Sequence, residues 1–271
     1  MQNMKKIRLF AGLFLAVAMC TPALFAQGQI PAKLTLNDGR SIQGKVRWMP
    51  IGKKYVLTRS MPGGQSTTIE LSLSKVKAVE VQKPPKLFPA IKAVKAGKGA
   101  AAIPVLKDIV KNYAMLRWDE MAARYLAEAQ LATGDAAGAV KTCEGLIDVK
   151  EELAYIGEVA PIYWQALLKT GKTAKLSSLI SKAISQGDAS VSAHALIMRG
   201  DMLMEKREYT NALKDGYLRV VVLYGNVKDV QPEALYKGAK AFEALSQNTN
   251  AEKLRSELRS KFPRSSYAKK L

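Results

Sequence analysis

The chain has 271 residues, of which 48% are hydrophobic and 24% are charged, so it is long enough for one large or two modest domains that bury their own core. Its formal net charge is +19, and such a chain attracts polyanions. One histidine and two cysteines are too few for the catalytic dyads and metal clusters that use these residues. We therefore expect no catalytic residues, no metal and no cofactor.

Residues 1–26 have the composition of a secretion signal. Basic residues at positions 5, 6 and 8 precede an apolar run from Leu9 to Cys20, and Ala26 is a small residue that suits cleavage. We expect cleavage near Ala26 and a mature chain that is periplasmic or associated with the cell envelope. Two alternatives stay open: an uncleaved anchor, and a lipid on Cys20, although Met19 is larger than the residue that this processing prefers.

Cleavage would leave Cys143 as the only cysteine of the mature chain, so no disulfide can form within it. Cys143 lies among Val140, Leu146 and Ile147 in a helical pattern. We interpret it as a small apolar core residue rather than a reactive thiol.

Residues 27–82 show the period of two that is typical of β-strands. Leu34 and Leu36 alternate with Thr35, and four further short runs continue the pattern to Val81. Turn signals separate the runs, such as Gly39, which can take a positive φ in a tight hairpin. Five short strands in so few residues predict a small antiparallel β-barrel, because closure removes exposed sheet edges.

One motif in this segment is similar to the opening hairpin of SH3-like and Sm-like barrels. It reads Leu36-x-Asp38-Gly39-Arg40-x-Ile42-x-Gly44-x-Val46. Sm proteins contact RNA bases through further loop residues, which have no convincing counterpart in this sequence. The resemblance therefore does not imply an RNA-binding ring, and we do not expect nucleic acid as a partner.

The positive charge is concentrated near the front of the chain. Residues 27–98 carry 14 Lys and Arg against three acids, a net +11, whereas residues 99–271 carry only +5. Such a segment attracts anionic lipid headgroups or envelope polymers. The alternative is a solvated basic surface without a dedicated ligand. The candidate polyanion-binding residues are Arg40, Lys45, Arg47, Lys53, Lys54 and Arg59.

Residues 83–89 form a predicted linker rich in proline and lysine. Pro84 and Pro85 fix φ and resist both helix and sheet. We therefore expect the barrel to be held at a restricted angle to the rest of the chain.

Residues 90–271 have a helical period that is broken at regular intervals. The breaks at Gly97, Gly134, Gly171 and Arg207 are 37, 37 and 36 residues apart. Five residues after each break stand Ala102, Ala139, Leu176 and Ala212, so three of the four copies have a small residue where two helices must approach closely. A period in the thirties built from paired helices indicates an α-solenoid, here of about five repeats. The turn of the fifth repeat is expected at residues 247–250.

Two helix boundaries depend on local signals. Pro104 is tolerated only in a first helical turn, so the second helix of the first repeat should begin near Ile103. The first helix of the third repeat should run from residue 154 to residue 169. In that repeat Trp164 and Leu176 replace small residues, so its helices should cross at a wider distance.

The helical part resembles the tetratricopeptide repeat (TPR) family, whose unit is a helix pair with small residues at the crossing. The matching motifs are Gly200-Asp201, Tyr209-x-x-Ala212, Leu223-Tyr224, Pro232-Glu233-Ala234-Leu235 and Lys261-Phe262-Pro263-x-Ser265 with Ala268. The resemblance is to the periplasmic branch of the family, which includes the Tol-Pal-associated coordinator and the lipoprotein of the outer-membrane assembly machine. It implies an adaptor without enzymatic activity.

In the TPR family, partners bind the concave face along the first helix of each repeat. Counting back from the breaks, the resemblance assigns this face to Arg124, Glu128, Gln165, Lys169, His194, Asp201, Tyr236 and Lys240. The mixture of charges suits an extended peptide or a helix; the alternative is an ordinary solvated helix surface. We expect an exported scaffold that binds a protein or peptide partner in the cell envelope, or alternatively a protein that binds an anionic envelope polymer or lipid through the basic barrel. The sequence does not indicate an oligomeric state.

Overall fold

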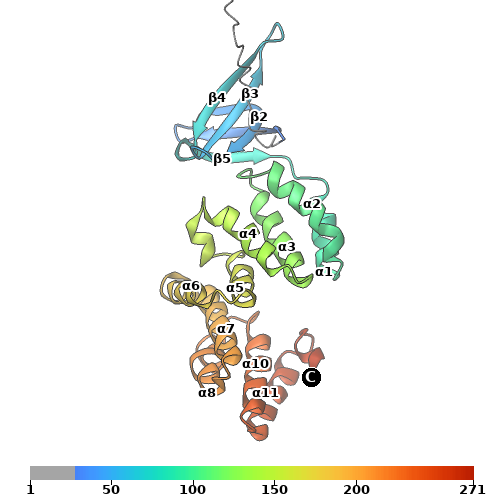
Figure 1. The fold of residues 1–271 in the computed structure, drawn as a ribbon, viewed down its shortest axis with the longest axis vertical. Helices are drawn as coiled ribbons and strands as arrows, with labels where there is room; N and C mark the ends of the chain where they lie inside the picture. The colour runs from blue at the N-terminus through green and yellow to red at the C-terminus, as the bar shows by residue number, and fades with distance from the viewer. Residues whose placement is uncertain (1–27) are drawn as a thin grey trace, which may run out of the picture.

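The structure is a computed structural model and describes residues 28–271. The predicted leader, residues 1–26, and the alternative lipid site at Cys20 lie outside the described residues. Figure 1 shows a β domain at one end of an elongated molecule and a stack of helices that runs from it to the C-terminus. This arrangement confirms the predicted order of an antiparallel β domain followed by an α-solenoid of helix hairpins. The predicted closure into a barrel is not completed by backbone pairing in residues 28–271, because the fourth and fifth strands are the two edges of the sheet and do not pair with each other.

The β domain contains five antiparallel strands joined by short turns. They are β1 (Ile30–Leu36), β2 (Ser41–Met49), β3 (Lys54–Ser60), β4 (Ser66–Ser72) and β5 (Val76–Val81), with a 3-10 turn, η1 (Leu73–Lys75), before β5. The strand order is β4-β3-β2-β1-β5. Because side chains alternate along each strand, Leu34, Val46 and Leu57 point into one core, where each is fully buried.

Within residues 28–271 the helices form five hairpins. They are α1 (Leu87–Lys95) with α2 (Gly99–Asn112), α3 (Asp119–Ala132) with α4 (Ala136–Ile147), α5 (Ala160–Lys169) with α6 (Thr173–Gln186), α7 (Ala189–Glu205) with α8 (Tyr209–Ala212) and α9 (Leu218–Leu223), and α10 (Gln231–Ala244) with α11 (Asn248–Lys261). A π-helical turn, η3 (Leu213–Tyr217), joins α8 to α9. Short 3-10 turns, η2 (Glu151–Ala154) and η4 (Ala268–Lys270), precede α5 and end the chain.

The first helix of every hairpin ends in the same turn. Gly97, Gly134, Gly171, Arg207 and Ser246 have positive φ angles between 57° and 86°. In each turn this residue donates its N–H to the carbonyl three residues earlier, and the next residue donates to the carbonyl five residues earlier. This is the Schellman motif, which satisfies carbonyls that a helix end leaves unpaired. The four predicted breaks are therefore confirmed, and the fifth turn is centred at Ser246.

Small residues lie at the helix crossing in four of the five hairpins, and Leu176 in the third is the exception. The position five residues after each break is buried in all five hairpins, at Ala102, Ala139, Leu176, Ala212 and Ala251. In the fourth hairpin the two helices approach closely, since a Cβ added to Gly216 would lie 2.6 Å from the Cα of Gly200. The backbones of α7 and η3 are therefore in direct contact.

Two predicted helix boundaries were wrong. The second helix of the first repeat, α2, begins at Gly99 rather than near Ile103, so Pro104 lies inside the helix. The Schellman turn at Gly97 reverses the chain within two residues, and the helix restarts at once. In the third repeat, α5 begins at Ala160 instead of residue 154. Gly157 has a φ of 83°, which is incompatible with an α-helix, so the helix begins only after it.

The core of the β domain is completed by the loop between α2 and α3. Met115 and Leu116 from this loop are buried in the same cluster as the strands. The Tyr55 hydroxyl of β3 donates to the carbonyl of Met115 at 2.9 Å, and the buried Asp119 carboxylate accepts from the N–H of Met115 at 2.7 Å. The β domain is thus held against the solenoid by shared packing as well as by the chain at residues 82–86.

Candidate partner-binding groove

The first helices of the hairpins form the inner row of the solenoid. Besides its own partner, α3 contacts α1 and α5, and α7 contacts α5 and α10. The described second helices lack comparable contacts with one another. The residues predicted for a concave face therefore lie on helices that line one continuous side.

A hollow of about 460 Å³ lies on this row between α3, α5 and α7. Its walls come from these helices, from the irregular segment before α5 and from the loop before α10. It is lined by Arg124, Ile156, Gly157, Glu158, Pro161, Ile162, Trp164, Asp188, Ser190, Val191, His194 and Asp229. Both apolar and charged side chains line it, as expected for a site that binds part of a peptide.

Arg124 forms one wall of the hollow. Its guanidinium pairs with the Glu158 carboxylate and lies 5.0 Å from the Tyr125 ring centre. The buried Arg124 Nε has no hydrogen-bond partner among residues 28–271. A second hollow of about 240 Å³, lined also by Met121, lies on the other side of the pair. The Arg124–Glu158 ion pair therefore separates two hollows on the inner face.

His194 forms the opposite wall. Its Nδ1 lies 2.8 Å from the carbonyl of Ser190, so this nitrogen carries the proton and donates to the carbonyl. Its Nε2 faces the Asp229 carboxylate at 4.0 Å. The floor is Trp164, which is buried and donates its indole N–H to the Ala154 carbonyl at 2.8 Å.

The structure brings together only two of the eight predicted groove residues in this hollow, Arg124 and His194. Gln165 and Lys169 lie exposed on α5, and Glu128 is partly buried on α3. Tyr236 and Lys240 line a separate hollow of about 320 Å³ near the C-terminus, together with Ala239, Glu243, Arg255, Arg259, Lys270 and Leu271.

Asp201 lines neither of these two hollows and lies in a network of charged and hydroxyl groups. Its carboxylate accepts from the Tyr217 hydroxyl at 2.7 Å and from Lys237 Nζ at 2.6 Å. Lys237 also pairs with Glu233 at 2.6 Å. Burial raises the pKa of Asp201 despite the nearby ammonium, and burial together with the Asp201 charge raises the pKa of Tyr217. This predicted groove residue thus joins the fourth repeat to the fifth.

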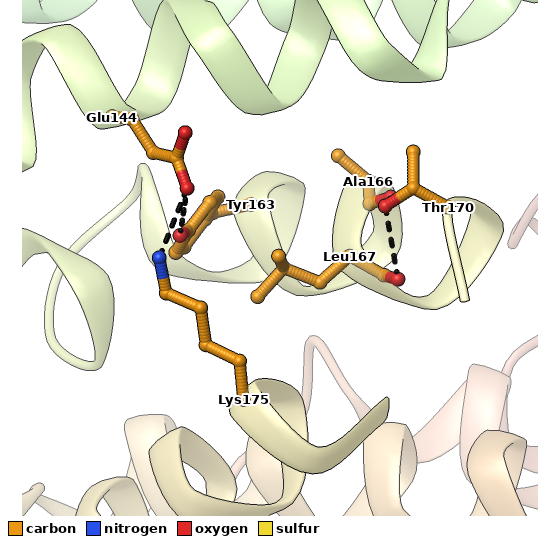
Figure 2. Close-up of polar contacts among 6 residues, drawn as sticks. All are labelled: Glu144, Tyr163, Ala166, Leu167, Thr170 and Lys175. Atoms are coloured by element: carbon orange, nitrogen blue, oxygen red, sulfur yellow. Dashed lines mark hydrogen bonds and ion pairs between the residues drawn. The ribbon is translucent and has the colours of Figure 1, made fainter. Parts of the chain in front are cut away.

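A similar group of side chains joins the second repeat to the third (Figure 2). Figure 2 shows the Glu144 carboxylate from α4 accepting from the Tyr163 hydroxyl at 3.0 Å and from Lys175 Nζ at 2.9 Å. The hydrogen bond from Lys175 is the main cause that lowers the pKa of Glu144. In the same view, Thr170 at the end of α5 donates to the Leu167 carbonyl at 3.2 Å. Its hydroxyl also lies 2.8 Å from the Ala166 carbonyl.

The basic residues of the β domain are dispersed. Arg40 pairs with Asp38 at 2.7 Å, which lowers the pKa of that carboxyl, and Lys54 pairs with Glu70 at 2.5 Å. Lys53 turns toward the solenoid and donates to the Asp148 carbonyl at 3.3 Å, and Arg47 lies half-buried on β2. Of the six predicted residues, only Lys45 and Arg59 line one common hollow.

Other chemistry has little support in the described part of the chain. Residues 28–271 contain no group of three or more His, Cys, Asp or Glu side chains that could hold a metal ion. Cys143 is buried, and burial raises the pKa of its thiol to about 12. Among the helices of this region, none combines the length and the apolar character that a membrane span requires.

Sequence reasoning missed Glu158, Asp229 and Ile162, which complete the groove. Glu158 and Asp229 lie in irregular segments, and counting back from a helix break identifies only positions within a helix. Pro161, a typical first residue of a helix, could have shown that α5 starts late and that a loop precedes it.

Comparison with known proteins supports the fold. Neither a protein family model nor a curated protein matches the chain. Among solved structures, a substituted variant of TPR-like repeats from a putative kinesin light chain of Podosopora anserina is 16% identical, covering 66% of this chain and 95% of that chain with a TM-score of 0.50. The unsubstituted protein gives a TM-score of 0.48 at 16% identity, with 66% and 96% covered. A MamA structure gives 0.43 at 15% identity, with 65% and 97% covered.

Proposed function

We propose that the protein is an exported scaffold without enzymatic activity, which binds a segment of a partner protein on the inner face of its TPR-like solenoid. The observation that carries this proposal is the Arg124–Glu158 ion pair between two hollows on one row of first helices. A solenoid of this kind presents an extended surface rather than a closed pocket, and extended surfaces suit peptide segments.

The lining indicates the chemistry of the segment that would bind. Ile162, Pro161 and Val191 offer apolar contacts in the larger hollow, and Met121 offers one in the smaller hollow. An acidic side chain of the partner could replace Glu158 and pair with Arg124, whose buried Nε lacks a partner among the described residues. We therefore propose an extended segment with an acidic residue flanked by apolar ones.

The absence of enzymatic activity is part of the proposal and rests on the composition of the chain. It has one histidine, His194, whose Nδ1 is engaged by a backbone carbonyl, and one buried cysteine beyond the leader, Cys143. These two residues lie on different hairpins. A nucleophile and base within hydrogen-bond reach would be needed for the usual covalent chemistry.

The binding site is tested by photocrosslinking in intact cells. A photoreactive amino acid at Ile162, inside the hollow, should capture a discrete partner, whereas one at the exposed Ser178 on α6 should not. The charge reversal Arg124→Glu should abolish the captured band, and Lys240→Glu, in the separate hollow, should leave it unchanged. The proposal fails if both crosslinking positions give the same pattern or if the band survives Arg124→Glu.

Export is a separate part of the proposal and is supported by the leader sequence alone. Mass spectrometry of the mature chain should find Gln27 at its N-terminus and the protein in the envelope fraction. A chain that begins at Met1 and remains in the cytoplasmic fraction would contradict export. A lipid-modified Cys20 would keep export but replace cleavage at Ala26.

A further inference from the structure

The β domain has no acidic side chain left to neutralise its remaining cations. Residues 28–82 contain three acids, Asp38, Glu70 and Glu80. Each is already paired: Asp38 with Arg40 at 2.7 Å, Glu70 with Lys54 at 2.5 Å, and Glu80 with Lys33 at 2.9 Å. The remaining positive charge of the domain therefore lies open to anions from outside the molecule.

Two of these cations share a broad, shallow hollow of about 830 Å³. Lys45 on β2 lies directly opposite Thr58 on β3, and Arg59 follows Thr58. The remaining lining is rich in amide and hydroxyl groups and includes a single acid, the Glu80 that Lys33 already neutralises: Pro31, Ala32, Lys33, Gln43, Gly44, Ser60, Glu80, Val81 and Gln82. Ammonium, guanidinium, amide and hydroxyl groups together form a suitable surface for phosphate oxygens.

The aromatic residues of the β domain argue against single-stranded nucleic acid as the anion. Binding of single strands uses exposed aromatic rings on which bases stack. Residues 28–82 contain only Trp48 and Tyr55, and both rings are buried in the core, 5.0 Å apart between centres. The hollow therefore offers charge and hydrogen-bond donors without a stacking surface.

An apolar residue follows the cations at the tip of the next hairpin. Met61 comes two residues after Arg59, in the turn from β3 to β4, and is 46% exposed. In Figure 1 this turn lies at the end of the β domain that points away from the helices. Basic residues next to an exposed apolar side chain are the combination that binds an anionic membrane surface.

We propose that the hollow of Lys45 and Arg59, together with Met61, binds the phosphate headgroups of an anionic lipid surface. The hollow shares no lining residue with the groove between α3, α5 and α7, so membrane binding and partner binding would use different surfaces of the molecule. The proposal does not depend on the partner-binding groove.

Vesicle co-sedimentation of the mature protein tests the site. The protein should bind vesicles that contain phosphatidylglycerol, should not bind pure phosphatidylcholine vesicles, and should be released by salt. The double variant Lys45→Gln/Arg59→Gln should weaken binding by about thirtyfold, since each basic residue near an anionic surface contributes about a factor of five. The matched control Lys92→Gln/Lys98→Gln removes two exposed cations from the solenoid and should retain binding.

Further measurements separate binding of a lipid surface from binding of any polyanion and from attraction by net charge. Met61→Ser should weaken vesicle binding and leave binding of soluble polyphosphate unchanged. Equal losses in the site variant and the control would show attraction by net charge alone and overturn the site. Binding of polyphosphate or single-stranded DNA without binding of the vesicles would overturn the lipid surface, as would an absence of all binding by a wild-type protein whose circular dichroism shows that it is folded.

Discussion

The clearest test of how the fourth and fifth hairpins are held together is removal of an ammonium group that lies between two carboxylates. Lys237 pairs with Asp201 on α7 and with Glu233 on its own helix, both at 2.6 Å. All three side chains are largely buried, with 19% to 25% of their surfaces exposed. Lys237→Met keeps most of the volume of the side chain and leaves both carboxylates without their cation.

The expected loss is large at neutral pH. Breaking a buried ion pair by removing one partner typically destabilises a protein by 3–5 kcal/mol, and partial exposure places this cluster near the lower end, about 3 kcal/mol. Burial already raises the pKa of Asp201 above its ordinary value of 3.8. Losing Lys237 removes a favourable charge and should raise this pKa further.

The sign of the pH dependence follows from that raised pKa. A carboxyl that binds its proton more tightly in the folded state contributes stability below its unfolded pKa, and this contribution is lost as pH rises through the folded pKa. The difference between Lys237→Met and wild type should therefore be small below about pH 4 and reach about 3 kcal/mol near pH 7. Urea unfolding of both proteins at each pH measures it.

Lys240→Met is the matched control, because Lys240 is an exposed lysine one turn further along α10. It should change stability by less than about 0.5 kcal/mol. Hydrogen exchange of Lys237→Met should show faster opening of α10 and α11 than of α3 and α4. The reasoning is refuted if the loss in Lys237→Met is the same at both pH values, or if it is no larger than in the control.

Three other outcomes are expected. Arg207→Gly should stabilise the protein by about 0.5–1 kcal/mol in thermal unfolding, because Arg207 is held at a φ of 60°; Lys206→Gly, at a φ of −79°, should destabilise it by a similar amount. Gly216→Ala should cost about 1–3 kcal/mol, because the new Cβ would lie 2.6 Å from the Cα of Gly200. Cys143, whose pKa is about 12, should react with a thiol reagent at about pH 8 only after unfolding.

The regular part of the solenoid was predictable because its turns impose a local chemical requirement. A Schellman turn needs one residue at positive φ, and glycine adopts that conformation at least cost, so three of the five turns are marked by glycine at a period of 37 residues. The turn at Arg207 has no glycine and was recognised as part of a polar break between two helical patterns that fits the same period. Ser246 carries no such mark, and the fifth turn was correspondingly predicted a few residues late.

The candidate groove was less accessible to sequence reasoning. Arg124 and Glu158 are separated by 34 residues, and Glu158 belongs to a segment without a helical period. Asp201 matched a family position, yet Lys237 and Tyr217 from other helices engage its carboxylate. Counting positions along one helix does not predict contacts with side chains from other helices, because these contacts depend on how the hairpins pack.

The pairing of the basic residues in the β domain was likewise not predictable from the sequence. The excess of charge was visible in the composition, but the pairing of Arg40 and Lys54 depends on turn geometry and strand register. Lys33, which lines the hollow with Lys45 and Arg59, was outside the predicted set although it lies on the neighbouring strand.

The insertion of Met115 and Leu116 into the β domain has a consequence for how this protein can be divided. A fragment that begins after the proline-rich segment would expose both side chains to water, and a β-domain fragment would lack the side chains that fill its core. Neither part should therefore fold when it is expressed or fused to another protein without the other. We expect separated fragments to be insoluble and the two parts to be inherited together.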